Sequence, residues 1–408
     1  MRQLFVAGLL ALLPVPVARA QEVTEVDYLA GFGEGHAAVR ALTAGLAEAQ
    51  AARSRAGTLA NPRVEFWSER PDANPQVTNW TIAWTPPLDG RYRLGVKAAE
   101  AGVAAARDRL DSDRAGLRRE ARQAFADWSL AGERREVLRR QVDRVAALAA
   151  LERQRARVGE GSGLAARRLA LAEAEARASL GTAEAEVAMA EAVARALRPD
   201  LPASALPGAV TLPEPPADLD SSGAPDVGAL RRDLEQAGLE ARRTGRFLGF
   251  PTLQLGWQTI EDDGAGDSGP ILAAGWSIPL FDRSQADRLE AEGREAALGA
   301  HLTMARARAA GRVDGGLAAY RVLFASAGEA RDAAREIDRV IEAATAAFRA
   351  GEAGLTDLLE TLRSAVAARL REIDARAQAL GVHRDLEAVL GRPLPGGTEG
   401  EAAIGGDR

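Results

Sequence analysis

The chain has 408 residues, of which 47% are hydrophobic and only 4% aromatic, and it contains no cysteine. Its 52 basic and 58 acidic residues are interspersed, which argues against nucleic acid as a partner. This alanine-, arginine- and leucine-rich composition is typical of long helices more than of a compact enzyme. A fold without cysteine contains no disulfides.

Residues 1–20 are expected to be a secretory signal peptide. Arg2 precedes an apolar run over 4–17, and the small-x-small triplet Ala18-Arg19-Ala20 predicts cleavage after Ala20. The apolar run is too short, and too interrupted by proline, to span a bilayer durably. No later segment approaches about 18 consecutive apolar residues. Strands would therefore have to make any membrane crossing in the mature chain.

Residues 21–198 are expected to form the first of two repeats. Helical spacing over 26–55 ends at Asn61-Pro62, and the period then changes to two. Strands are predicted at about 62–70 and 77–86, with Trp80, Ile82 and Trp84 on one face. Residues 88–198 contain no proline and predict a long helical hairpin. Its first helix, over 91–157, would be roughly 100 Å long.

The same order returns after a proline-rich segment over 199–226, which is predicted to be a linker. The second repeat is expected over 227–392, with strands at about 250–260 and 270–280 and a long helical hairpin over 282–391. Residues 393–408 are expected to form a flexible tail.

Two subtractions support the duplication. Pro279 minus Pro87 is 192, and Gly351 minus Gly159 is also 192. The end of the strands and the glycine-marked helical reversal are therefore equally spaced in both halves, which predicts an internal repeat.

Four strands with an apolar face cannot close a barrel, and open sheet edges are not tolerated in lipid. Three chains contributing four strands each would close a barrel of about 12 strands, which lies within the known range. The predicted fold is thus mainly α with a small β part, built from a duplicated unit of helix, β-hairpin, long helix and returning helix.

Several motifs carry a family resemblance over about residues 27–392. They are Asn61-Pro62, Pro87-Leu88-Asp89-Gly90-Arg91, Ile278-Pro279-Leu280-Phe281-Asp282-Arg283 and the two Gly-Glu reversals. The chain resembles the TolC-type outer-membrane efflux proteins (outer membrane factors), and within them the heavy-metal efflux branch of the CzcC and CusC sort. Ser284-Gln285-Ala286 stands where that branch usually has Asn-Gln-Gly. The first reversal is interpreted as one residue longer than the second.

The resemblance implies a homotrimer that forms a roughly 12-stranded outer-membrane β-barrel, continued by an α-helical barrel through the periplasm. It implies a periplasmic adaptor and an inner-membrane pump of the RND type as partners, with outer-membrane lipid around the strands. The function implied is a passive exit duct, with divalent heavy-metal cations as the expected cargo and no cofactor or catalysis. Multidrug export, type I secretion and a periplasmic coiled-coil structural protein remain alternatives.

Asp357 and Glu360 are the predicted periplasmic gate. They share a helical face just after the second reversal, and three copies of two carboxylates would form a charged, cation-attracting constriction. In the first repeat Ala166 and Leu169 are expected at the matching positions. The alternative is an ordinary solvated helix face.

The two reversals are the predicted adaptor-docking tips. Their glycines are expected to permit the positive φ values that tight turns need, although a purely structural turn would also explain them. The predicted docking residues are Val158, Gly159, Gly161, Gly163, Leu164, Gly351, Gly354 and Leu355.

Five of the six tryptophans fall in the predicted strands, which favours an interfacial membrane girdle over ordinary core positions. They are Trp67, Trp80, Trp84, Trp257 and Trp276. No metal site is expected, because His36, His301 and His383 lack ligand neighbours at metal-binding spacing. The glycine-rich segment over 31–36 lacks both a preceding strand and the last glycine of a dinucleotide fingerprint.

Overall fold

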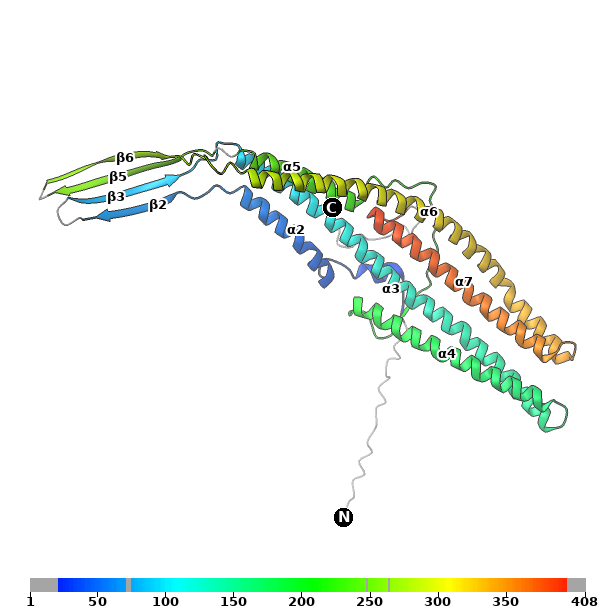
Figure 1. Cartoon of the computed structure of the whole chain (residues 1–408). Helices are drawn as coiled ribbons and strands as arrows, with labels where there is room; N and C mark the ends of the chain where they lie inside the picture. Colours follow the sequence, from blue (N-terminus) through cyan, green and yellow to red (C-terminus); the bar gives the residue numbers. More distant parts are fainter. Residues whose placement is uncertain (1–20, 71–74, 247–248, 263–264, 395–408) are drawn as a thin grey trace, which may run out of the picture. The chain divides into compact units, whose positions relative to one another are not determined.

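The computed structural model describes residues 21–70, 75–246, 249–262 and 265–394. The predicted signal peptide and almost all of the predicted tail lie outside these ranges. Two long helical hairpins dominate the described residues (Figure 1). The first is α3 (Arg91–Arg157) with α4 (Gly163–Leu197), and the second is α6 (Gln285–Ala350) with α7 (Leu355–Leu390). The prediction of a mainly helical chain with a small sheet part is confirmed.

The larger sheet is antiparallel and has the strand order β2-β3-β5-β6. Its strands are β2 (Arg63–Glu69), β3 (Gln76–Trp84), β5 (Thr252–Asp262) and β6 (Ala265–Gly275). Each repeat supplies one hairpin, and the pairing of β3 with β5 joins the two hairpins into one sheet (Figure 1). In that pairing Trp80 lies opposite Trp257, so the two repeats meet in register at a tryptophan pair.

The N-terminal segment differs from the single helix expected over 26–55. The structure has a short helix α1 (Glu25–Ala30), a break and then α2 (Ala37–Ala56). A three-residue strand β1 (Gln21–Val23) pairs in parallel with β4 (Ala205–Pro207). The proline-rich segment predicted as a linker therefore contains a strand. Three-residue strands carry no usable alternation in the sequence, so their pairing could not be predicted.

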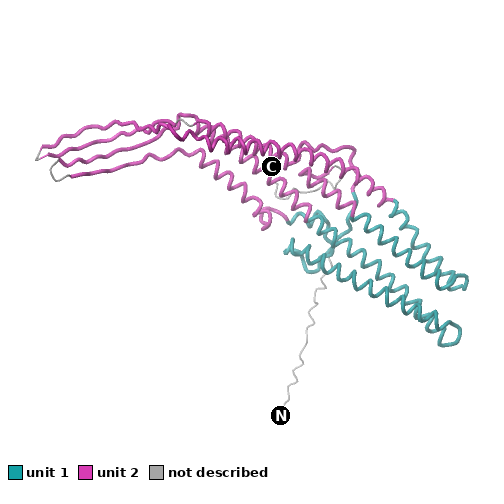
Figure 2. The backbone as a smooth tube through the Cα atoms, viewed as in Figure 1, with its two compact units in different colours: residues 1–31, 121–212, 329–377 teal, residues 32–120, 213–328, 378–408 magenta. Residues whose placement is uncertain are grey.

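The chain divides into two compact units, which are coloured separately in Figure 2. Unit 1 comprises residues 1–31, 121–212 and 329–377, and unit 2 comprises residues 32–120, 213–328 and 378–408. Unit 2 contains the four-stranded sheet and helix α5 (Pro225–Thr244), which packs through Val227, Leu230 and Leu234 on Leu302 and Ala309 of α6.

The core of unit 1 is built from all four long helices. Val145 and Leu148 of α3, Leu169 of α4, Ile337 and Ile341 of α6, and Leu358 and Leu362 of α7 form one buried cluster. Their three- and four-residue spacing places each set on a single helical face. This burial supports helices whose propensity alone would be marginal in water.

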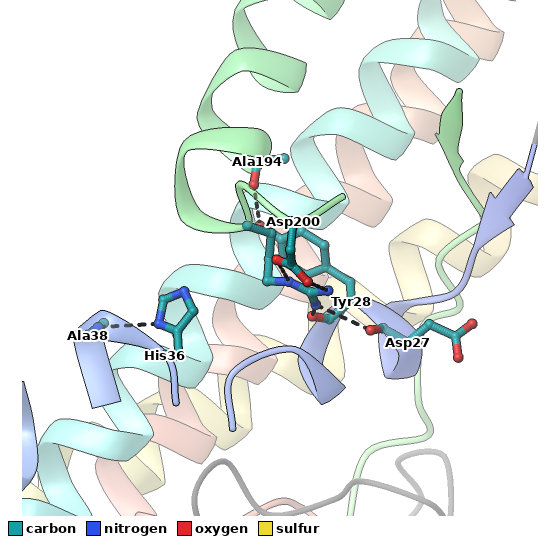
Figure 3. A network of polar contacts seen from close by, with 7 residues as sticks. Asp27, Tyr28, His36, Ala38, Ala194 and Asp200 are labelled. Carbon is teal, nitrogen blue, oxygen red and sulfur yellow. Dashed lines mark hydrogen bonds and ion pairs between the residues drawn. The ribbon is translucent and has the colours of Figure 1, made fainter. Parts of the chain in front are cut away.

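Arg198 joins the start of unit 1 to the end of α4, in the region where Figure 3 shows Asp27, Tyr28, Ala194 and Asp200 near one another. Its guanidinium binds both carboxylate oxygens of Asp200 at 2.8 Å and donates to the backbone oxygens of Tyr28 and Asp27. The buried Tyr28 hydroxyl donates to the Ala194 carbonyl at 2.8 Å. The bidentate pair and the buried hydroxyl bond hold α1 against α4. Thr24 and Asp27 complete a capping box at the start of α1.

Candidate functional site

One face of the four-stranded sheet is apolar and exposed. Cross-strand partners point to the same side of a sheet, so the register Val64–Ile82–Leu255–Leu272 defines one apolar row. The neighbouring rows add Phe66, Trp80, Trp84, Leu253 and Trp257. These nine large side chains, the apolar sheet face, are each between 37% and 83% exposed. The same face turns polar toward the hairpin turns, where Ser68, Thr78, Thr259 and Ser268 lie.

The opposite face is mostly polar. It carries Glu65, Asn79, Thr81 and Gln258, and Trp67 lies among them because it pairs with Asn79. The expectation that all five strand tryptophans form one girdle is wrong for Trp67. The period-two alternation of β2 places it on the side away from Trp80.

Trp84 and Trp276 make the same hydrogen bond in the two repeats. The Trp84 indole donates to the Ala60 carbonyl at 3.1 Å, and the Trp276 indole donates to the Gly249 carbonyl at 2.9 Å. Each bond ties the end of a hairpin to the backbone that enters it. These two tryptophans therefore have a structural role at the end of the sheet next to the helices, in addition to any lipid contact.

The two helical reversals share one backbone motif. In the first, the amide of Glu160 donates to the Arg155 carbonyl at 2.9 Å; in the second, the amide of Glu352 donates to the Ala347 carbonyl, also at 2.9 Å. The residues before these donors, Gly159 and Gly351, have φ values of 81° and 80°. Both reversals are thus Schellman endings with a left-handed glycine.

Only Gly159 and Gly351 of the five predicted tip glycines adopt a positive φ. Gly161 is needed for a different reason: a Cβ there would lie 2.8 Å from the Arg155 Cβ and 2.9 Å from the Ala156 nitrogen. Gly163 is the first residue of α4, and Gly354 immediately precedes α7. Neither needs a left-handed conformation, which corrects the expectation for Gly161, Gly163 and Gly354.

The start of the returning helix corrects the comparison between the tips. Helix α7 begins at Leu355 and α4 at Gly163, and 355 minus 163 is 192. The offset of the repeat is therefore kept through the tip, and the first reversal has no extra residue. Asp357 and Glu360 correspond to Ala165 and Arg168, and the expected equivalents Ala166 and Leu169 are wrong. The first residues of α4 and α7 decide how the two returning helices align, and the sequence alone does not locate these helix starts.

The remaining predicted tip residues differ in how far they are exposed to solvent. Val158 and Leu164 of the first tip are 66% and 62% exposed. Leu355 of the second tip is half-buried and packs against the unit 1 core. The first tip therefore presents more apolar surface.

Asp357 and Glu360 are both exposed at the start of α7. The carboxylate of Asp357 accepts a hydrogen bond from the Gly354 amide at 3.3 Å, so this residue caps the helix. Glu360 lines a groove of about 520 Å³ between α4 and α7, together with Arg168 and Arg363. Arg363 pairs with Glu175 at 2.7 Å, and Arg168 donates to Thr356 at 3.4 Å.

These arginines and Glu175 belong to the surroundings of the predicted gate. No sequence pattern signals them, because they come from two distant helices. No group of three or more metal-binding side chains occurs in the part of the chain that the structure describes. Within the same residues, no helix is long and apolar enough to span a bilayer.

Known proteins share sequence or structural features with this chain. Residues 225–392 match the family model of the outer membrane efflux proteins. The structure of CusC superposes with a TM-score of 0.74 at 17% identity, covering 90% of this chain and 91% of that one. The CmeC outer membrane channel of Campylobacter jejuni gives 0.74 at 13% identity, covering 99% and 96%. The chain has the fold of these outer-membrane channels.

VceC, an outer membrane protein of Vibrio cholerae, also shares this outer-membrane channel fold, with a TM-score of 0.71 at 16% identity over 90% of this chain and 95% of that one. No curated protein matches the sequence at a significant level. The match to the efflux family covers the second repeat, and the structural matches extend the shared fold to both repeats.

Proposed function

We propose that this protein is the outer-membrane exit duct of a tripartite efflux system, working passively as a homotrimer. The observation that carries the proposal is the apolar sheet face, which one chain leaves uncovered on a sheet that continues into two long helical hairpins. Water would penalise nine exposed large apolar side chains at about 25 cal/mol per Å² of their surface, whereas lipid would cover them. The polar opposite face suits a water-filled lumen.

The sheet edges support a closed assembly. Strands β2 and β6 are the two outer strands of the sheet, and each has one neighbouring strand among the described residues of this chain. In lipid their free amide and carbonyl groups would be unsatisfied. Pairing β6 of one copy with β2 of the next would satisfy both edges, and three copies would give a barrel of about 12 strands.

The helical hairpins are proposed to form the periplasmic tunnel. Their tips would dock onto a periplasmic adaptor, which links the duct to an inner-membrane pump of the RND type. Exposed Val158 and Leu164 offer the apolar contact area for docking. Asp357 and Glu360 are proposed to line the closed aperture, since both are exposed on α7.

The proposed cargo is divalent heavy-metal cations. The support is the motif Ile278-Pro279-Leu280-Phe281-Asp282-Arg283 together with the acidic pair, whose carboxylates would attract cations without holding them. A deletion strain tests this with zinc, cobalt, cadmium, copper and silver against dyes and detergents. Sensitivity to the metals alone supports metal efflux. Sensitivity to dyes alone identifies a multidrug duct, and loss of a secreted protein identifies type I secretion.

The exit-duct proposal is tested by fractionation and by two matched substitutions. The protein is expected in the outer-membrane fraction as a detergent-resistant, heat-modifiable trimer. Leu255→Arg places a charge on the apolar sheet face and is expected to cost about 2–4 kcal/mol in lipid. Gln258→Arg, on the polar face of the same strand, is the control and should leave the trimer intact. Recovery of the wild type only as a soluble periplasmic monomer would refute the proposal.

A further inference from the structure

An open pocket of about 650 Å³, here called the junction pocket, lies among the segments that connect the four-stranded sheet to its helices. Ala60 and Gly249 line it, and these are the residues whose carbonyls accept the Trp84 and Trp276 indole bonds. Arg91, Arg243 and Arg246 also line it. The pocket therefore lies directly where the apolar strands give way to helices.

Two of the three guanidinium groups in the junction pocket are not neutralised by a carboxylate of the described residues. Arg91 pairs with Asp89 at 2.8 Å. Arg246 donates to the Asp89 backbone carbonyl at 2.7 Å, a neutral acceptor, and Arg243 forms no ion pair within the described part of the chain. The remaining acid of the lining is Asp287. With Arg91 and Asp89 balanced, two positive charges face one negative charge.

Apolar groups complete the surroundings of the pocket. Leu59, Pro86, Pro87 and Phe250 form part of its wall. On the segments that leave the sheet, Leu88 is 71% exposed and Phe281 is 92% exposed, the highest value among the large hydrophobic side chains described. Arginine beside exposed apolar and aromatic side chains is the combination that suits a membrane–water boundary.

We propose that the junction pocket binds the phosphate of an anionic phospholipid headgroup in the inner leaflet of the outer membrane. The proposal rests on the proposed function, which places this end of the sheet at the periplasmic membrane surface. Arg243 and Arg246 would donate charge-assisted hydrogen bonds to the phosphate oxygens. The acyl chains would extend from the pocket along the apolar sheet face, which begins at Trp84 and Leu253.

Native mass spectrometry of the full-length protein in detergent tests the site. The probes are dioctanoyl phosphatidylglycerol, dioctanoyl phosphatidylcholine and inorganic phosphate. The wild type is expected to retain phosphatidylglycerol, and Arg243→Gln with Arg246→Gln should weaken that binding by about tenfold or more, since two charged hydrogen bonds are lost. Arg242→Gln with Arg283→Gln removes the same charge from neighbouring residues outside the lining and should retain the lipid.

Three results would overturn the proposal: equal retention of phosphatidylglycerol by the wild type and the pocket variant, equal loss in the control variant, or full displacement by equimolar inorganic phosphate. Equal binding of phosphatidylcholine would overturn the preference for an anionic headgroup. Conductance of the same samples in planar bilayers separates this from the exit-duct proposal. A conducting trimer with unchanged lipid binding in the pocket variant refutes the site alone, whereas absence of conductance in the wild type refutes the duct.

Discussion

The two helical tips have the same backbone conformation at the reversal, but they carry different side chains. Both end the outgoing helix with the same Schellman hydrogen bond and a left-handed glycine, at positions 192 residues apart. The returning helices begin differently. The Ser162 hydroxyl accepts from the Ala165 amide at 3.4 Å, whereas the Asp357 carboxylate accepts from the Gly354 amide at 3.3 Å. Each tip thus keeps a different half of a capping box.

The difference shows where the repeat was free to diverge. A reversal of the chain needs a left-handed residue, so glycine remains in both copies. A helix start needs a side-chain acceptor, but either Ser162 or Asp357 can supply one. The second tip supplies this acceptor as Asp357, where the first tip has Ala165, and it also has Glu360 where the first tip has Arg168. At these matching positions Arg168 and Glu360 carry opposite charge, and Asp357 stands against the neutral Ala165.

The largest effect is expected from removing the acids of the second tip. Asp357→Ala with Glu360→Ala takes six carboxylates from a trimer, each worth on the order of 1 kcal/mol to a cation at ~4 Å even in water. Single-channel conductance should rise and cation preference should fall in planar bilayers. Asp332→Ala with Glu336→Ala removes the same charge from exposed residues of α6 outside the groove and should change neither property. Unchanged behaviour of the first variant would refute the gate.

Gly161→Ala should destabilise the first tip by about 1–3 kcal/mol, as expected for overpacking. The new Cβ would lie 2.8 Å from the Arg155 Cβ, on a helix that cannot easily move. The matching residue of the second tip is already Ala353, and Ala353→Gly should have a much smaller effect. Hydrogen exchange at the Glu160 amide measures the effect of Gly161→Ala, and exchange at the Glu352 amide measures the effect of Ala353→Gly. Similar losses of protection in the two variants would contradict the proposed crowding.

Gly159→Ala and Gly351→Ala should each cost about 1–2 kcal/mol, because a left-handed conformation penalises any Cβ. A Cβ at either position meets open space, so backbone strain is the whole effect. Hydrogen exchange at the Glu160 and Glu352 amides is expected to accelerate equally in the two tips. A twofold difference in the free energy of opening would show that the two reversals are not equivalent.

Ser162→Ala should cost about 1 kcal/mol by removing the cap of α4. The Ala165 amide, which donates to the Ser162 hydroxyl, is expected to exchange its hydrogen faster. Asp357→Asn keeps an oxygen acceptor for the Gly354 amide and should change the second tip less. Greater fraying of α7 in Asp357→Asn than of α4 in Ser162→Ala would show that charge, more than hydrogen bonding, holds the second helix start.

The sequence determined the elements with a strong period and the duplication. The strands, the long helical hairpins and the 192-residue offset are local or repeated patterns, so periodicity and spacing alone predict them. The apolar sheet face was predictable from alternation, and the same alternation could have separated Trp67 from Trp80. The exposure of Asp357 and Glu360 on α7 also follows from the helical period.

Tertiary structure decided what depends on residues far apart in the chain. The β1–β4 pairing, the burial of Leu355, the register of the returning helices and the arginine cluster of the junction pocket each bring together side chains or backbone from distant segments. Three-residue strands and single arginines have no periodic signal, because what defines them is a partner that only folding supplies. The sequence therefore predicted the elements of each repeat, and the packing of those elements determined which side chains meet in the candidate sites.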